Sequence, residues 1–284
     1  MESLEESFVK YDLAFKGKVR NVYNFDSDRL LIVTTDRISA FDFVFDDLIL
    51  NKGILLTKMA KFWFDKTEHI TANHIAHGVD EKLPATFADR CMLVKKTKVL
   101  PVEAIVRGHL DGSAWETYQK NKKINGMIID GKYQKYDKLQ SPIFTPSTKA
   151  KVGDKDLNIS IIEMENILGS ELTAKIIEIS FALYKFAYNY AKERGIIIAD
   201  TKFEFGIDKD NNLILIDEIF TPDCSRFWLY DKKTDLTDHE SFDKQFFRNY
   251  LIKNNWNNTQ INIPDDLKRV LINKYQLAYD LITS

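Results

Sequence analysis

Hydrophobic and polar residues alternate along two short stretches in the second half of the chain, 199–206 and 213–218. Alternation with a period of two predicts β-strands with one buried face. The stretch between them, 208–212, contains only Asp, Lys and Asn, and Asp and Asn tolerate the left-handed backbone of a tight turn. The three stretches together predict a β-hairpin.

The rest of the chain also follows either the strand or the helix period. Strands are predicted at 17–23, 29–34, 92–94 and 102–107, with a polar loop at 36–42. Helices are predicted at 53–67, from about 114, from Ser160 with its capping partner Glu163, at 171–194, at 242–254 and after Pro264. This mixture predicts an α+β fold with antiparallel sheets and packed helices. Residues 95–101 could connect two lobes, 1–98 and 99–284.

The predicted hairpin carries acids where strands rarely carry them. If its tip lies between Asp210 and Asn211, Glu204 faces Asp217 across the two strands. Like charges that face each other destabilise a sheet, so this pair calls for a cation between the carboxylates or a raised pKa in one of them. Magnesium, held by one or two carboxylates together with substrate phosphates, would satisfy the pair. An ATP site is the leading hypothesis, and solvated edge charges are the alternative.

Other charged residues adjoin the hairpin. Lys202 shares a strand face with Glu204 by alternation. Directly after the second strand comes a turn, 221–226, which carries Asp223 and Arg226. We therefore expect an acid pair, a lysine and an arginine to converge at one place.

Two further segments could bind phosphate. Lys18 and Arg20 would share one face of a strand that starts at Gly17, although short basic alternations are usually solvated and no P-loop pattern is present. Ser113 stands three residues before a glutamate, which is typical of a helix N-cap, and a helix N-terminus near Arg107 would also bind a phosphate. These two interpretations of the serine are compatible. His109, by contrast, is expected to be a core or loop histidine.

Composition limits the classes of partner. The chain has 284 residues, of which 44% are hydrophobic, and a net charge of −2 from 40 basic and 42 acidic residues. A balanced charge argues against nucleic acid or a membrane surface as the main partner. Two cysteines, Cys91 and Cys224, are too few for a disulfide framework and favour a reducing cytoplasm. The N-terminal segment 1–6 carries three glutamates and no apolar targeting core, so we expect no export.

Several long motifs in order resemble the phosphoribosylaminoimidazole-succinocarboxamide synthase (SAICAR synthetase) family. The resemblance extends from Gly17 to Trp228. It rests on the segments 17–20, 35–42, 101–108, 112–113, 145–149, 200–206, 217–218 and 225–226. The chain departs from the family pattern at Lys151, Lys155 and Cys224.

The resemblance implies a two-lobed, ATP-grasp-like ligase of purine biosynthesis. Such an enzyme joins L-aspartate to the carboxylate of carboxyaminoimidazole ribonucleotide through an acyl phosphate, using ATP and Mg²⁺. The lobe 1–98 would cover the nucleotide, and the lobe 99–284 would hold the metal and the substrates. The partners implied are small molecules, with a monomer or homodimer in the cytoplasm.

The resemblance also implies roles for individual residues. Catalysis would involve Lys202, Asp223 and Arg107. ATP would be bound by Gly17, Lys18, Arg20, Val99 and Glu103, and Mg²⁺ by Glu204 and Asp217. The ribonucleotide would be bound by Arg37, Ser39, Arg107, Ser113, Ser225 and Arg226.

Two other functions share these features. A small-molecule kinase would use the same nucleotide site and acids but would transfer phosphate to a hydroxyl group. A non-catalytic nucleotide-binding module would bind ATP without turnover. Release of ADP that depends on aspartate separates the ligase from both.

Overall fold

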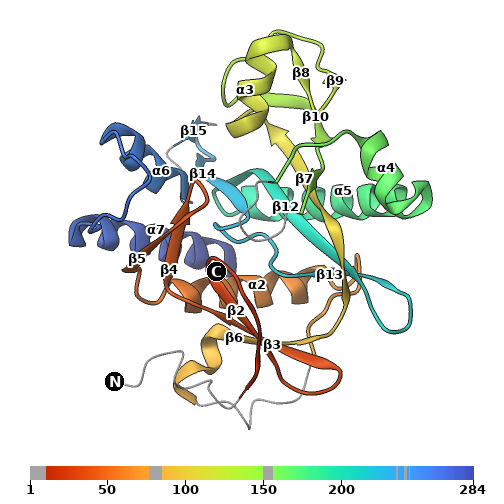
Figure 1. Cartoon of the computed structure of the whole chain (residues 1–284). Helices are drawn as coiled ribbons and strands as arrows, with labels where there is room; N and C mark the ends of the chain where they lie inside the picture. The colour runs from red at the N-terminus through yellow and green to blue at the C-terminus, as the bar shows by residue number, and fades with distance from the viewer. Residues whose placement is uncertain (1–10, 77–84, 150–155, 235, 240–241, 243) are drawn as a thin grey trace.

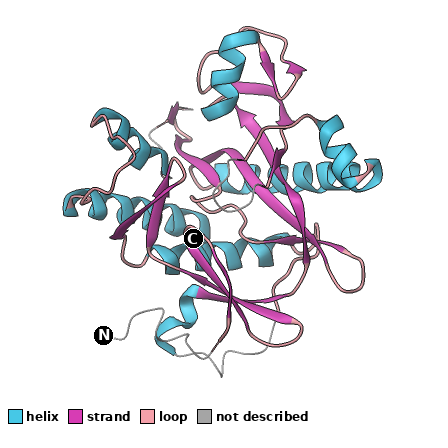
Figure 2. Ribbon diagram, in the orientation of Figure 1, coloured by secondary structure: helices cyan, strands magenta, loops and turns pink. Residues whose placement is uncertain are grey.

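A computed structural model describes residues 11–76, 85–149, 156–234, 236–239, 242 and 244–284 (Figure 1). Lys151, Lys155 and the N-terminal segment 1–6, about which the sequence raised expectations, lie outside these residues. Antiparallel sheets and helices make up the fold, as predicted, with helices packed on the sheets (Figure 2). No helix in the described ranges is long and apolar enough to cross a membrane.

The N-terminal part contains an antiparallel sheet in the order β1-β2-β3-β6. Its strands are β1 (Leu13–Lys16), β2 (Arg20–Asn24), β3 (Arg29–Thr34) and β6 (Cys91–Lys95). The prediction of one strand starting at Gly17 was wrong: Gly17 lies in the turn between β1 and β2, where its N–H donates to the carbonyl of Arg20 at 2.8 Å. Lys18 therefore lies in the turn and not on a strand face with Arg20.

The predicted polar loop at 36–42 was also wrong. Residues Arg37–Ala40 form β4, which pairs with β5 (Phe43–Leu48) in a separate hairpin. This hairpin forms because Ile38, Ala40 and Phe45 are buried against α6 (Lys244–Lys253) and α7 (Asp265–Thr283), which the local pattern does not reveal. Figure 1 shows the hairpin beside these two helices.

The larger sheet has the order β10-β7-β12-β14-β15, with β11 paired to β7 and β13 paired to β12. The strands are β7 (Lys98–His109), β10 (Lys138–Phe144), β11 (Ser147–Thr148), β12 (Ile196–Ile207), β13 (Leu213–Ile216), β14 (Ser225–Asp231) and β15 (Leu236–Asp238). The strands β8 (Lys123–Ile124) and β9 (Met127–Ile128) form a separate two-stranded sheet. Because β7 already begins at Lys98, the link from β6 is shorter than the predicted 95–101.

The predicted hairpin is formed by β12 and β13, but its register differs by one residue. Glu204 pairs with Ile216, and not with Asp217. Asp217 follows the end of β13 and has a left-handed backbone, with φ of 65°. The strand therefore ends one residue before the predicted partner, and the carboxylate of Asp217 is directed by a turn instead of by strand alternation.

Helices cover the sheets and complete the core. They are α2 (Lys52–Thr67), α3 (Gly112–Asn121), α4 (Ile161–Leu168), α5 (Ser170–Lys192), α6 and α7, with a 3₁₀ helix η2 (Ala85–Arg90). The predicted capping box of Ser160 and Glu163 is confirmed at the start of α4. Figure 1 shows α5 crossing behind β7 and β12.

The main core crosses the predicted boundary between 98 and 99. Trp63 of α2 is fully buried, and its ring centroid lies 5.1 Å from that of Phe220. Phe220 in turn contacts Phe203 of β12 edge to face, at 5.2 Å. Packing of this kind joins the N-terminal and C-terminal parts over apolar surface, and the division into two lobes stays a prediction.

Candidate active site

A cavity of about 260 Å³ lies where β7, β12 and β14 meet the turn before β14. The residues that line it are Ile105, Arg107, Asp200, Thr201, Lys202, Pro222, Asp223, Cys224, Ser225, Arg226 and Arg248. The structure brings together five residues that the sequence predicts for the site: Arg107, Lys202, Asp223, Ser225 and Arg226. Ile105 and Pro222 are apolar, Cys224 carries a thiol, and the other lining residues are polar or charged.

Two arginines, one on each of the strands that flank β12, share the carboxylate of Asp200 on β12. Nη1 of Arg107 lies 3.1 Å from Oδ2 of Asp200, and Arg226 binds the same oxygen. Arg107 also donates to Oγ1 of Thr145 at 2.9 Å and to Oγ of Ser113 at 3.4 Å. Burial lowers the pKa of Arg107 although the Asp200 carboxylate opposes this. The two guanidinium groups are thus held close together, in an arrangement that suits a doubly charged anion such as a phosphate.

The start of α3 borders the two arginines. The predicted N-cap role of Ser113 was wrong: the cap is Asp111, whose carboxylate accepts from the N–H of Gly112 at 2.7 Å. Asp111 caps because it precedes the first helical residue in an extended conformation. The hydroxyl of Ser113 therefore remains directed at Arg107. Gly112 has φ of 55°, and a Cβ there would lie 2.3 Å from Nη2 of Arg226.

A second group of charges surrounds Lys202. Glu204 pairs with Glu103 across β12 and β7, so two like charges do face each other, although on a different strand pair from the one predicted. Nζ of Lys202 lies 2.7 Å from Glu103 and 2.5 Å from Glu204. Lys149 also binds Glu204, and Ser147 donates to Glu103 at 3.0 Å. Lysines therefore supply the positive charge that the facing carboxylates of Glu204 and Glu103 require.

These lysines determine the protonation of the group. Burial alone would raise the pKa of Glu204, but Lys202 and Lys149 outweigh burial and lower it to about 2. Burial would likewise lower the pKa of Lys202, but Glu204 and Glu103 raise it well above its ordinary value. At neutral pH the carboxylate and the ammonium are both charged.

A third group joins the N-terminal sheet to the end of β13. Nη1 of Arg20 lies 3.3 Å from Oδ1 of Asp217, and Arg20 also binds Glu218. Burial raises the pKa of Asp217, as do the nearby charges of Glu204 and Glu218, while Arg20 opposes them. The carboxylates of Asp217 and Glu204 are therefore close enough to interact electrostatically despite the shifted register.

Glu204 and Asp217 fit a magnesium ion that phosphates and water complete. Both offer the hard oxygen atoms that Mg²⁺ prefers, and burial, together with the neighbouring Glu204 and Glu218, raises the pKa of Asp217, so a bound cation would favour its charged form. No set of three or more His, Cys, Asp or Glu gathers as a metal site among the residues that the structure describes. The protein would thus hold the ion through few ligands, as is usual for nucleotide-bound Mg²⁺.

The other predicted ATP and substrate residues lie outside the lining of the cavity. Lys18 is half exposed and pairs with Asp42 at 2.5 Å. Arg37 donates to the carbonyl of Gly17 at 3.0 Å and to the side chain of Asn21 at 2.8 Å, so it braces the glycine turn. Ser39 is buried in β4. Val99, on β7, is 46% exposed, which suits contact with a flat ligand.

Sequence reasoning missed the partners of Asp223. Its carboxylate accepts from Nζ of Lys52 at 2.8 Å and from the hydroxyl of Tyr275 at 2.9 Å. The side chains of Lys52 and Asp223 are 0% and 1% exposed. A lysine in the first turn of a helix opposes the helix dipole, and this could have drawn attention to Lys52. No comparable signal marks Tyr275.

Cys224 does not act as a nucleophile at this cavity. Burial raises its pKa to about 12, with the charge of Glu218 adding to the effect. Its thiol contacts the carbonyl of Thr221 and the hydroxyl of Ser225 at 3.6 Å each. The thiol therefore stays protonated and packs within the turn.

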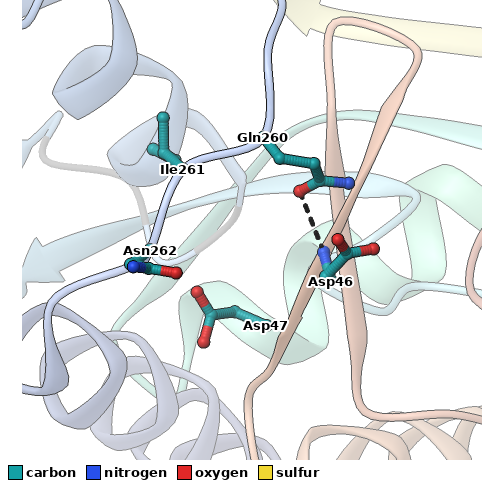
Figure 3. Close-up of a pocket in the computed structure, with 5 residues that line it drawn as sticks. All are labelled: Asp46, Asp47, Gln260, Ile261 and Asn262. Atoms are coloured by element: carbon teal, nitrogen blue, oxygen red, sulfur yellow. Dashed lines mark hydrogen bonds between the residues drawn. The ribbon is translucent and has the colours of Figure 1, made fainter.

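A second cavity, of about 300 Å³, lies between β5 and the segment before α7 (Figure 3). It is lined by Asp46, Asp47, Gln260, Ile261 and Asn262. Gln260 accepts from the backbone N–H of Asp46 at 3.1 Å, and Asp47 accepts from the N–H of Ile263 at 2.6 Å. Lys268 also binds Asp47. These contacts attach β5 to the C-terminal segment, and we assign them a structural role.

The chain is similar to known proteins over nearly its whole length. The family model for SAICAR synthetase matches residues 13–263. The phosphoribosylaminoimidazole-succinocarboxamide synthase of Methylobacillus flagellatus is 43% identical, over 99% of this chain and 97% of that protein. The SAICAR synthase of Saccharomyces cerevisiae in complex with SAICAR superposes with a TM-score of 0.87 at 39% identity, over 100% of this chain and 97% of that one. A SAICAR synthetase in complex with ADP gives 0.72 at 25% identity, over 95% and 97%.

Proposed function

The chain belongs to the SAICAR synthetase family, and we propose that the residues around the 260 Å³ cavity carry out the reaction of that family. The reaction is the ATP-dependent ligation of L-aspartate to the carboxylate of carboxyaminoimidazole ribonucleotide, which gives SAICAR, ADP and phosphate in purine biosynthesis. The observation that best supports this placement is the pair of arginines, Arg107 and Arg226, on one carboxylate beside Lys202.

Arg107, Arg226 and Ser113 would bind the phosphate of the ribonucleotide. The two guanidinium groups already lie close together on Asp200, and the hydroxyl of Ser113 lies within 3.4 Å of Arg107. A phosphate accepts several charge-assisted hydrogen bonds, and arginine presents its donors in a planar fork. Ser225 lines the same cavity and would contact the sugar, with Ser39 and Arg37 supporting the site from β4.

ATP would lie along the N-terminal sheet and the start of β7. The turn at Gly17 and Lys18 would cover its phosphates, Val99 would contact the adenine, and Glu103 would border the site with Lys202. Arg20 would stand near the phosphates, where it holds Asp217 and Glu218. Glu204 and Asp217 would hold Mg²⁺, which supplies charge neutralisation to the triphosphate when bound.

The chemistry would proceed in two steps. A carboxylate oxygen of the ribonucleotide attacks the γ-phosphorus of ATP, and ADP leaves. The amine of aspartate then attacks the acyl carbon of the acyl phosphate, phosphate leaves, and the amine loses a proton. Lys202 is charged at neutral pH and would stabilise the negative charge of the transferred phosphoryl group. Asp223, fixed by Lys52 and Tyr275, would position the turn that carries Ser225 and Arg226.

We further propose that the protein acts in the cytoplasm. Cys91 and Cys224 are both free thiols, and the cytoplasm keeps thiols reduced.

The test is release of ADP from Mg-ATP with carboxyaminoimidazole ribonucleotide, measured with and without L-aspartate, together with the mass of the product. ADP formation that requires both substrates, and a product with the mass of SAICAR, is the expected result. ADP formed without aspartate together with a stable phosphorylated product would favour the kinase. Tight ATP binding without ADP under any combination of substrates would favour the binding module.

A further inference from the structure

We propose that Arg248 of α6 binds a carboxylate of L-aspartate. The inference rests on the proposed function and adds to it the residue that holds the amino-acid substrate. The sequence pattern predicts a helix at 242–254 and assigns it no site residue. The structure instead places one of its side chains in the lining of the cavity that contains Arg107, Lys202 and Arg226.

The packing of α6 fixes the direction of Arg248. Phe247 and Leu251, four residues apart, are 0% and 1% exposed and face β4 and β5. The ring of Phe247 contacts that of Phe45 edge to face, with 5.0 Å between centroids. Arg248 follows Phe247 by one position, about 100° around the helix, so it lies beside the anchored face and reaches the cavity.

An aromatic ring supports the guanidinium group from the side of the β4–β5 hairpin. Cζ of Arg248 lies 5.8 Å from the ring centroid of Phe41, which stands at the turn between the two strands. A planar guanidinium beside an aromatic face is restricted in direction and keeps its charge. The contact with Phe41 therefore helps to hold the guanidinium group of Arg248 on this side of the cavity.

The charges around the cavity favour an anionic ligand near α6. Among the described residues that line it, four are cationic and two are anionic. The four cations are Arg107, Lys202, Arg226 and Arg248, and the two anions are Asp200 and Asp223. Asp200 is shared by Arg107 and Arg226, and Asp223 is bound by Lys52 from outside the lining.

Arg248 differs from the other three cations in its origin. Arg107, Lys202 and Arg226 come from adjacent strands of one sheet, where they pair with Asp200 or Glu204, and the proposed function assigns them to the phosphate groups. Arg248 reaches the cavity from a helix. L-aspartate has two carboxylates, and its amine must reach an acyl carbon beside this group of charges. A guanidinium fork matches a carboxylate in a bidentate geometry, so Arg248 suits this substrate.

The experiment measures the KM of each of the three substrates for Arg248→Gln and Arg248→Lys. Losing a charge-assisted hydrogen bond predicts that the KM for L-aspartate rises roughly 10- to 100-fold in Arg248→Gln, with the KM values for ATP and the ribonucleotide within about threefold of wild type. Arg248→Lys keeps the charge without the fork and should give an intermediate KM for aspartate.

Lys253→Ala is the matched control, because Lys253 is an exposed cation at the C-terminal end of the same helix. It should leave all three KM values unchanged. Thermal unfolding of each variant shows whether α6 stays packed, and Arg248→Lys retains a test if Arg248→Gln does not fold. An unchanged KM for aspartate, or a selective rise for the ribonucleotide, would overturn the inference. If the wild-type protein itself forms no SAICAR, the proposed function fails instead.

Discussion

At the scale of single residues, Glu204 and Asp217 have different surroundings although both are proposed to bind Mg²⁺. Two lysines hold Glu204, whereas Asp217 contacts one arginine at 3.3 Å. Removing either charge should leave the fold intact and lower kcat by about 100-fold or more, because charge neutralisation dominates phosphoryl transfer. The measurement is kcat against Mg²⁺ concentration for Glu204→Gln and Asp217→Asn.

Asp210→Asn serves as the control for this pair, since Asp210 is exposed at the tip of the same hairpin. It should respond to Mg²⁺ as the wild-type protein does. Unchanged magnesium-dependent activity in both Glu204→Gln and Asp217→Asn would exclude them as the metal ligands.

His109 is the core histidine that the sequence predicted, and it should make stability depend on pH. Its Nδ1 lies 3.2 Å from the carbonyl of Tyr136, and burial lowers its pKa to about 4. The unfolded chain takes up a proton below about pH 6.5, while the folded protein does so only near pH 4. The free energy of unfolding should therefore fall as the pH drops from 6.5 towards 4, by up to about 1.4 kcal/mol per pH unit.

Urea unfolding at pH 7 and pH 5 measures this effect. His109→Gln should lose less stability between the two pH values than the wild-type protein does. His69→Gln, at an exposed position, should lose as much as the wild type. Equal losses in His109→Gln and wild type would show that His109 is not the group that titrates.

At the scale of elements, the first turn of α3 depends on having no side chain at Gly112. Its φ of 55° is costly for other residues, and a Cβ would meet the guanidinium of Arg226 at 2.3 Å. Gly112→Ala should lower the free energy of unfolding by about 1 kcal/mol or more and raise the KM for the ribonucleotide several-fold. Steady-state kinetics and urea unfolding measure the two effects.

Gly126→Ala separates the backbone effect from the displacement of Arg226. Gly126 has φ of 83°, but a Cβ there would meet no atom within 4 Å. This variant should lose similar stability and keep the wild-type KM. A normal KM in Gly112→Ala as well would show that Arg226 does not need its present position.

The elements that sequence predicted well are those defined by local signals. The helix α5 was predicted from a 3.6-residue period followed by Gly195, and α4 from a capping box. The register of the β12–β13 hairpin could not be predicted in this way. The register depends on where β13 ends. Asp217, the next residue, has a left-handed backbone although it is not a glycine, so the sequence does not mark this end of the strand.

The site residues also divide into those that local sequence predicts and those that depend on contacts between distant parts of the chain. Arg107, Lys202 and Arg226 were predicted because motif and strand alternation place them, and they line one cavity. Lys52, Tyr275 and Arg248 were missed because they reach the site through the packing of helices that are distant in sequence. Strand β4 was missed for a related reason, since its burial comes from α6 and α7.

At the scale of the whole molecule, Lys52, Asp223 and Tyr275 join three distant parts of the chain through buried contacts. Lys52→Met leaves the carboxylate of Asp223 buried without its closest cation and should cost about 3 to 5 kcal/mol of unfolding free energy. Lys52→Met combined with Asp223→Asn removes both charges and should recover part of that loss. Urea unfolding of the single and double variants measures the coupling.

Lys58→Ala on the same helix is the comparison, because its ion pair with Asp89 is exposed. It should change the unfolding free energy by less than about 0.5 kcal/mol. If Lys52→Met proved equally mild, the buried contact would not support the fold as described.

The hydroxyl of Tyr275 on Asp223 also has a consequence for the order of events during protein synthesis. The ribosome makes the turn at 221–226 well before it makes α7, which begins at Asp265. The nascent chain can pair the sheet strands early, yet it cannot complete the support of this turn until α7 has emerged and docked. We therefore expect nascent chains stalled before α7 to bind ribonucleotide weakly, so that the cell gains a competent enzyme only after translation has passed the catalytic motifs.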